Sequence, residues 1–125
     1  MPMRSYESRE MYLENILILT KTQPDLHAID IAMHMGYTKP SISRAMSRLK
    51  QEGLINIDEL DHISLTESGR AIAEKIYERH TILSAMLEML GVDKATADED
   101  ACRMEHAMSD VTFEAIKRHM AQYSK

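Results

Sequence analysis

A cysteine, a glutamate and a histidine lie close together near the C-terminal end of the chain. Cys102, Glu105 and His106 are spaced at i, i+3 and i+4, so on a helix their side chains project from one face. A thiolate, a carboxylate and an imidazole that converge on one point form half of a transition-metal site. The alternative is that Cys102 is a small buried hydrophobic residue and that Glu105 and His106 are surface residues. Both interpretations are open at this point.

The same residues allow two other kinds of chemistry. A thiolate at Cys102 with His106 one turn away would sense oxidants, and peroxide would then regulate the protein. A Cys–His pair also occurs in enzymes that use a nucleophile. The sequence, however, has no glycine-rich loop for an oxyanion and no third residue that would orient the histidine. We therefore expect that the protein is not an enzyme.

Length and composition limit the class of protein. The chain has 125 residues, of which 44% are hydrophobic and 28% charged, so it should fold as one domain or as two small ones. A single cysteine excludes an internal disulfide and favours a reducing compartment. The longest apolar stretch, Ile16 to Leu19, is too short to span a membrane, and the N-terminus lacks a signal-peptide core. We expect a cytoplasmic protein without a membrane partner.

The hydrophobic pattern predicts a mainly α fold with one small β-hairpin. Apolar residues at helical spacing predict helices over residues 5–21, 27–35 and 38–52, with Gly36 ending the second and Thr38 capping the third. Two short alternating segments, 54–58 and 62–65, predict a hairpin. Further helices are predicted over 67–90, where Thr66 is the cap, and over 94–107 and 110–122. A helix-turn-helix followed by a hairpin is typical of a winged helix-turn-helix.

The predicted third helix is basic in an acidic protein. The chain carries a formal charge of −5, but the segment from Thr38 to Glu52 has four Lys and Arg against one Glu, a net charge of +3. Three serines lie among these cations, and Arg with short hydroxyl side chains suits phosphates and base edges. A solvated basic helix face is the alternative, but the hairpin that follows favours DNA binding. The tip of that hairpin is acidic, so we expect the wing to stabilise the fold more than to clamp DNA.

Two segments resemble a known family. "DEDACRMEHAMSD", residues 98–110, is similar to the metal-ligand helix of the diphtheria toxin repressor family of iron-dependent regulators, and "SREMYLENI", residues 8–16, resembles its first helix. "RLKQEGLI" and "LTESGR", between Arg48 and Arg70, resemble bacterial winged-helix regulators. The likeness covers nearly the whole chain in the same order of elements. It implies a metal-dependent repressor.

The resemblance implies which residues bind the activating metal. In the iron-sensing branch a Met from the first helix joins a Cys, a Glu and a His, which here are Met11, Cys102, Glu105 and His106. Thioether and thiolate are soft ligands that suit Fe(II), Co(II) or Ni(II) better than Mn(II). The manganese-sensing relatives carry carboxylates at the positions of Met11 and Cys102. Fe(II) is therefore the expected cofactor, with Mn(II), Co(II), Ni(II) or Zn(II) binding in vitro.

The family also implies a second metal site. This chain matches only some of the ligand positions known for that site. Glu14 and His80 match ligand positions of the manganese branch, and Asp98 stands where the iron branch has a His. Ser84 occupies a position where the iron branch has a Glu. We expect Glu14, His80 and Asp98 to bind a second metal, and a Glu14–His80 hydrogen bond is the alternative.

The DNA contacts of the family map onto the start of the third helix. They fall on Thr38, Pro40 and Arg44, and the iron branch has a Gln at the position of Arg44. Arg favours guanine edges or phosphates whereas Gln favours adenine, so the operator sequence should differ. The expected phosphate contacts are Lys39, Ser41, Ser43 and Arg48.

The expected organisation is two small domains. Residues 1–70 would form the winged helix-turn-helix DNA-binding domain and residues 71–125 an all-helical dimerisation and metal-binding domain. The expected function is Fe(II)-activated repression of metal-homeostasis genes by a homodimer on palindromic operator DNA, without a small organic substrate. A Mn(II)-responsive regulator and a cysteine-based redox regulator are the alternatives. The larger iron regulators add a C-terminal domain that resembles an SH3 barrel, whereas this chain stops at Lys125, as the short manganese regulators do.

Overall fold

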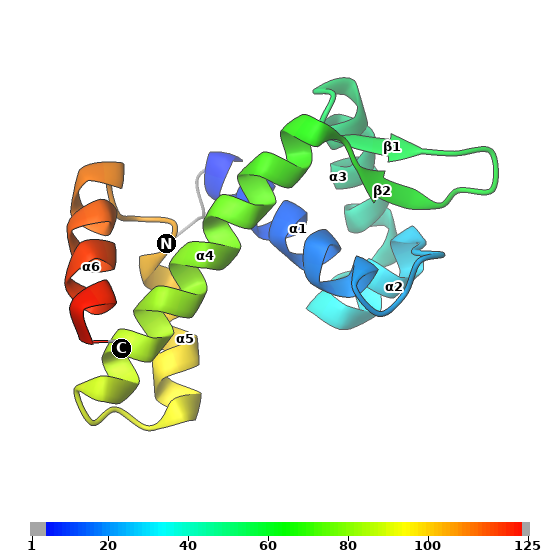
Figure 1. Ribbon diagram of the computed structural model, residues 1–125. Coiled ribbons are helices and arrows are strands. Elements are labelled where there is room, and N and C mark those ends of the chain that lie inside the picture. The colour runs from blue at the N-terminus through cyan, green and yellow to red at the C-terminus, as the bar shows by residue number, and fades with distance from the viewer. Residues whose placement is uncertain (1–4, 124–125) are drawn as a thin grey trace. The chain divides into compact units, whose positions relative to one another are not determined.

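A computed structural model describes residues 5–123 of the chain and confirms the mainly helical fold with one hairpin. The chain divides into two compact units, residues 1–74 and 75–125. The domain boundary predicted between residues 70 and 71 stays a prediction. In chain order the elements are α1 (Ser5–Thr20), α2 (Ala28–Met35), α3 (Lys39–Gln51), β1 (Ile55–Ile57), β2 (Ile63–Leu65), α4 (Glu67–Met89), α5 (Lys94–Met104) and α6 (Asp110–Tyr123) (Figure 1).

The first unit is built around the apolar faces of α1, α2, α3 and the hairpin. These elements bury a continuous cluster of aliphatic side chains, which includes Leu13, Ile16, Leu26, Ile31, Ile42, Met46, Leu49, Leu54, Ile55 and Ile63. Burying one such side chain is worth roughly 1.5–3 kcal/mol relative to exposure. The cluster therefore fixes which face of α3 points inward and which face is left to solvent.

The turn between α2 and α3 follows from two local signals that the sequence shows. Gly36 adopts a left-handed conformation, with φ 73°, and ends α2. The Thr38 side chain accepts a hydrogen bond from the N–H of Ser41 at 3.3 Å, and Pro40 lies in the first turn of α3, where a missing N–H is tolerated. The helix-turn-helix predicted from these residues is present.

The hairpin pairs β1 with β2 in antiparallel register, with Ile57 opposite Ile63. Its turn is held by the Asp58 carboxylate, which accepts hydrogen bonds from the N–H groups of Leu60 and His62 at 2.9 and 2.8 Å. The bond from His62 is the main reason that the pKa of Asp58 lies below its usual range. Asp61 adopts a left-handed conformation with φ 62°, which Asp tolerates better than most residues. The wing is thus a tightly hydrogen-bonded turn.

The second unit contains the part of α4 from Lys75 onward, with α5 and α6. Its two short helices begin at side-chain caps: Asp93 accepts from the N–H of Thr96 at 3.0 Å, and Ser109 accepts from the N–H of Thr112 at 3.2 Å. The bond from Thr96 lowers the pKa of Asp93. The buried apolar residues of this unit are Ile76, Leu83, Ala97, Ala101, Phe113 and Met120.

A backbone contact joins the start of α4 to the residue before β1. Gly69 lies in the first turn of α4, where glycine is about 1 kcal/mol less favourable than alanine. A Cβ atom at this position would lie 1.9 Å from the carbonyl oxygen of Leu54, which is far inside van der Waals contact. The Thr66 hydroxyl closes the same junction by donating to the Gly53 carbonyl at 2.7 Å. Position 69 therefore has no room for a side chain.

We expect Gly69→Ala to destabilise the first unit by about 3 kcal/mol, because the added methyl group forces the Leu54 carbonyl to move. The measurement is the free energy of unfolding from urea denaturation. Ser68→Ala, at the neighbouring exposed position of the same helix, is the matched control and should change it by less than about 0.5 kcal/mol. Equal stabilities for the two variants would show that the contact is not tight.

Candidate metal centre

A buried arginine organises the turn between α5 and α6. Arg79 lies on α4 with 5% of its surface exposed. Its Nη1 donates hydrogen bonds to the carbonyl oxygens of Glu105 and Met108 at 3.0 and 2.6 Å. Its Nη2 donates to the carboxylate of Asp110, and the guanidinium lies over the ring of Phe113, 5.2 Å from the ring centre. One side chain therefore fixes the backbone that carries Glu105 and His106.

The carboxylate of Glu105 is the most unusual group in the second unit, because it is fully buried. Its Oε2 lies 2.9 Å from His80 Nδ1, and its Oε1 lies 3.3 Å from His106 Nε2. Among the residues that the structure describes, none donates a hydrogen bond to Oε1. A buried carboxylate is stable only when its charge is compensated, and two imidazoles beside it are metal-ligating groups. The arrangement fits a divalent cation.

A second carboxylate approaches His80 from its other side. Asp98 Oδ1 accepts a hydrogen bond from the Ser84 hydroxyl at 2.6 Å and lies 3.9 Å from His80 Nε2. Lys94 donates to Asp98 Oδ2 at 3.3 Å. The bond from Ser84, with smaller contributions from Lys94 and His80, holds the pKa of Asp98 below its usual range. His80 thus stands between the carboxylates of Glu105 and Asp98.

The end of α5 differs from the helix predicted over residues 94–107. The helix ends at Met104, and Glu105 is its C-cap, with φ −62° and ψ −26°. The residues that follow form a turn in which the N–H of Ala107 donates to the carbonyl of Met104 at 3.1 Å. The hydrogen bonds that Arg79 donates to the carbonyls of Glu105 and Met108 explain the early end, because they hold the chain in the turn.

The three residues of the predicted half-site differ in burial. Glu105 and His106 are buried, whereas the side chain of Cys102 is exposed on α5. The alternative interpretation, in which Cys102 is a buried hydrophobic residue and the other two are surface residues, is therefore wrong. An exposed thiol can be reached by a metal ion or an oxidant from solution.

The remaining predicted ligands, Met11 and Glu14, lie on α1 in the first unit. The sulfur of Met11 accepts a weak hydrogen bond from the Tyr37 hydroxyl at 3.8 Å, and its carbonyl accepts one from Asn15 at 2.8 Å. Because Met11 and Glu14 belong to one unit and the other ligands to the second, a joint metal site stays a prediction.

The predicted DNA-contacting residues share the solvent side of α3. Opposite them, Ile42, Met46 and Leu49 are buried in the core. The side chains on the solvent side are exposed apart from Ser41, which is partly exposed; they are Thr38, Lys39, Pro40, Ser41, Ser43, Arg44 and Arg48. The cations of α3 are therefore available to a partner.

Sequence reasoning missed Arg79 and the hydrogen bond from Ser84 to Asp98. A signal for Arg79 exists: together with Ile72, Ile76 and Leu83 it falls on the apolar stripe of α4, where a charged residue needs buried partners. No comparable pattern marks Ser84, because its partner is fourteen residues away.

Comparison with known proteins identifies the family. Residues 66–125 match the metal binding and dimerisation domain of iron dependent repressors. An uncharacterized HTH-type transcriptional regulator of Methanocaldococcus jannaschii is 33% identical over 119 residues, which are 94% of this chain and 95% of that protein. The chain belongs to the iron-dependent repressor family. Members of this family are metal-dependent transcriptional regulators, not enzymes.

Other matched proteins are named as a transcriptional regulator, with no metal stated, and as a manganese regulator. The transcriptional regulator MntR of Escherichia coli O157:H7 is 32% identical over 106 residues, covering 85% of this chain and 68% of its own. The structure of the manganese regulator SloR superposes with a TM-score of 0.79 at 26% identity, covering 90% of this chain and 53% of that one. Within residues 5–123, no helix of this family member is long and apolar enough to cross a membrane.

Replacing Arg79 tests the role of the turn. Arg79→Met leaves two carbonyl oxygens without their donor, so we expect a loss of about 2–3 kcal/mol in the free energy of unfolding. We also expect weaker Co(II) binding in a calorimetric titration, since the backbone of Glu105 is no longer fixed. Arg103→Met is the matched control, because among the described residues Arg103 pairs with Glu99 and Asp100 at the surface. An Arg79 variant as stable as the control would contradict this role.

Proposed function

We propose that this family member is an Fe(II)-activated transcriptional repressor that binds palindromic operator DNA as a cytoplasmic homodimer and controls metal-homeostasis genes. The observation that carries the proposal is the fully buried Glu105 carboxylate between His80 and His106. Oε1 lies 3.3 Å from His106 Nε2, within ion-pair distance, but receives no hydrogen bond from the described residues. A dication would supply the missing compensation.

The proposed activating site consists of Met11, Cys102, Glu105 and His106. Glu105 and His106 are held next to each other by the turn that Arg79 fixes, and Cys102 lies one helical turn before them. A bound metal would act as a Lewis acid that neutralises Glu105 and ties this turn to α1. A second site at Glu14, His80 and Asp98 is supported within the second unit by Asp98, whose Oδ1 lies 3.9 Å from His80 Nε2.

The choice of Fe(II) rests on the donor types. A thioether and a thiolate are soft ligands, and the carboxylates of the manganese branch are absent at Met11 and Cys102. Names among the matched proteins point to both metals: the matched domain is named for iron, and SloR is named a manganese regulator. A Mn(II)-responsive regulator is therefore the second candidate.

The exposed basic face of α3 supports DNA binding. Lys39, Arg44 and Arg48 are exposed on it, with Ser43 between them, so phosphates and base edges can approach.

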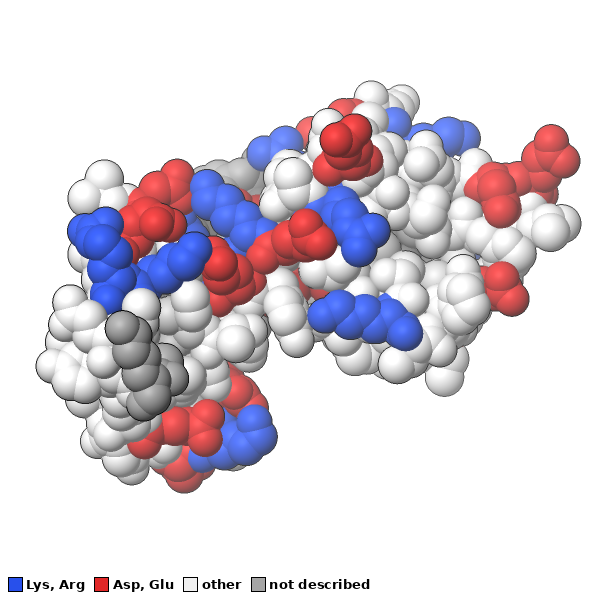
Figure 2. Space-filling view, viewed as in Figure 1, with Lys and Arg blue, Asp and Glu red and all other residues white. Residues whose placement is uncertain are grey.

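The charge of the wing indicates a different role for the hairpin. On the face drawn in Figure 2, acidic side chains gather at the end of the hairpin, whose turn contains Asp58, Glu59 and Asp61. Phosphates would be repelled there, so the wing stabilises the fold and α3 contacts the DNA.

Exposed apolar residues in the second unit support a homodimer. Leu90 and Val111 are 73% and 81% exposed, and Met89 and Tyr123 are 54% and 58% exposed. Exposed apolar side chains of this size can be covered when a second chain packs on them. The same unit matches the family's metal binding and dimerisation domain. Two symmetric copies of α3 would address two half-sites of a palindrome.

The metal preference can be measured directly. We expect fluorescence anisotropy with operator DNA, recorded without oxygen, to show that Fe(II) and Co(II) activate binding at lower free metal concentrations than Mn(II). The reason is that Met11 and Cys102 supply soft donors. Zn(II) should bind tightly in vitro and serves as the control for donor strength. Activation by Mn(II) at lower concentrations than Fe(II) would favour the second candidate.

The ligand assignment is tested by Cys102→Ala and His106→Ala. Each variant should lose metal-dependent DNA binding by more than about 100-fold, beyond the loss expected for an outer-shell partner, while remaining a folded dimer by sedimentation. His119→Ala, which removes an exposed histidine of α6, is the matched control and should respond to metal normally.

A Cys102 or His106 variant with an unchanged metal response would show that the assignment is wrong. Release of DNA from the unaltered protein by peroxide but not by a chelator would favour the redox alternative, which the exposure of Cys102 permits.

A further inference from the structure

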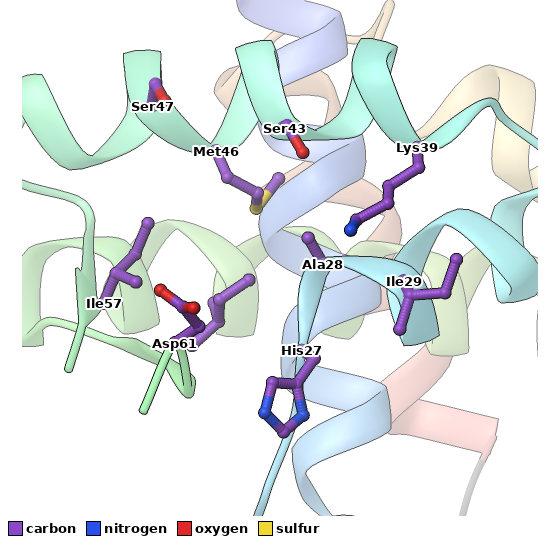
Figure 3. A pocket seen from close by; sticks show the side chains of 10 residues that line it. His27, Ala28, Ile29, Lys39, Ser43, Met46, Ser47, Ile57 and Asp61 are labelled. Carbon is purple, nitrogen blue, oxygen red and sulfur yellow. The ribbon is translucent and has the colours of Figure 1, made fainter. Parts of the chain in front are cut away.

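A groove in the first unit opens beside the DNA-contacting face of α3. Its volume is about 390 Å³, and it lies between α3, the start of α2 and the hairpin. Volumes of this size accommodate small organic ligands. Figure 3 shows side chains from all three elements around it, with Ser43, Ser47 and Lys39 on the side of α3. These three residues recur at i, i+4 and i+8, so they form one stripe along the helix.

The lining combines an apolar floor with charged groups of opposite sign. Met46 and Ile63, which are 2% and 3% exposed, form part of the floor. The ammonium group of Lys39 extends from α3 toward the start of α2, whereas the carboxylate of Asp61 belongs to the hairpin side (Figure 3). One end of the groove thus attracts an anion and the other repels one. A ligand with one carboxylate and an uncharged apolar body is attracted at the Lys39 end and is not repelled at the Asp61 end.

The walls of the groove are preformed. His27, at the N-terminus of α2, contacts the hairpin twice: its Nε2 lies 3.2 Å from the carbonyl oxygen of Leu60, and its ring meets the ring of His62 edge to face at 4.8 Å. The N–H of Ile63 donates to the carbonyl of Leu26 at 2.7 Å. Because these contacts hold the hairpin against the start of α2, little ordering is needed when a ligand binds.

We propose that this groove binds a small amphipathic monocarboxylate. The carboxylate pairs with the Lys39 ammonium group and accepts a hydrogen bond from the Ser43 hydroxyl, and the apolar chain covers Met46 and Ile63. A dicarboxylate of the same length is rejected, because its second charge meets Asp61. The site uses none of the proposed metal ligands.

The occupied groove would regulate DNA binding. A ligand over Lys39, Ser43 and Ser47 covers part of the helix face that contacts DNA, so ligand and operator compete. This consequence rests on the proposed function, whereas binding of the carboxylate itself does not. The two are therefore measured separately.

The test is an NMR titration of the metal-free 125-residue chain with hexanoate, followed at the methyl group of Met46. We expect saturable shifts with a Kd on the order of 1 mM, typical of eight heavy atoms in an open site. Lys39→Gln should weaken binding about fivefold, because it removes a charge-assisted hydrogen bond. Lys50→Gln, at an exposed position of the last turn of α3, is the matched control and should leave the Kd unchanged.

Adipate, the dicarboxylate of equal length, tests whether Asp61 repels a second negative charge at the other end of the groove. It should bind at least about fivefold more weakly than hexanoate to the unaltered protein. Asp61→Asn should restore adipate binding without disturbing the turn, because Asn also tolerates the left-handed conformation at this position. Equal affinities for the two ligands, or an Asp61→Asn variant that still discriminates against adipate, would overturn the proposal.

Competition is measured with the metal-loaded protein on operator DNA. Hexanoate should raise the apparent Kd for DNA in proportion to its occupancy, and adipate should not. Absence of hexanoate shifts in the DNA-free titration overturns the groove proposal and leaves the proposed function intact. A protein that binds hexanoate but no operator DNA overturns the proposed function and leaves the groove proposal intact.

Discussion

The second unit depends on how it accommodates the buried charge of Glu105. A carboxylate with no exposure is costly unless groups of opposite charge or hydrogen-bond donors surround it. The structure provides imidazoles on both sides of the carboxylate, and Arg79 holds the backbone carbonyl of the same residue. The guanidinium thus compensates the peptide group and leaves the side-chain oxygens to other partners. This division explains how a negatively charged group can be held ready in the interior of a small helical unit.

The charges of the chain are distributed unevenly along the sequence. The segment from Gly91 to Asp110 carries six acidic residues against two basic ones, whereas α3 is basic. Total charge is therefore a poor guide to partners, because it averages a surface that attracts anions with a segment that attracts cations. The hairpin adds a third local environment, in which Asp61 limits what can approach α3 from that side. Partners are therefore better inferred from a few neighbouring charges than from the total charge.

Local signals made most of the fold predictable, whereas long-range contacts did not. Gly36, Thr38 and Pro40 act within one turn of themselves, so the boundaries of α2 and α3 could be predicted to within a residue. The end of α5 could not be predicted from local signals, because it depends on Arg79, which is more than twenty residues earlier. The spacing of Cys102, Glu105 and His106 identified the candidate site but not the difference in their burial. The groove beside α3 has no local pattern, since three separate elements form it.

The contact between Gly69 and Leu54 restricts the choice of amino acid at one of its two positions much more than at the other. Leu54 contributes its carbonyl oxygen, a group that every amino acid offers, so this contact places no demand on the side chain at position 54. Position 69 must lack a side chain altogether. Substitutions can therefore accumulate on one side of the junction, within the limits of the core, while the other side tolerates a single residue. A contact between α4 and the residue before β1 thus restricts the amino-acid type at position 69 alone.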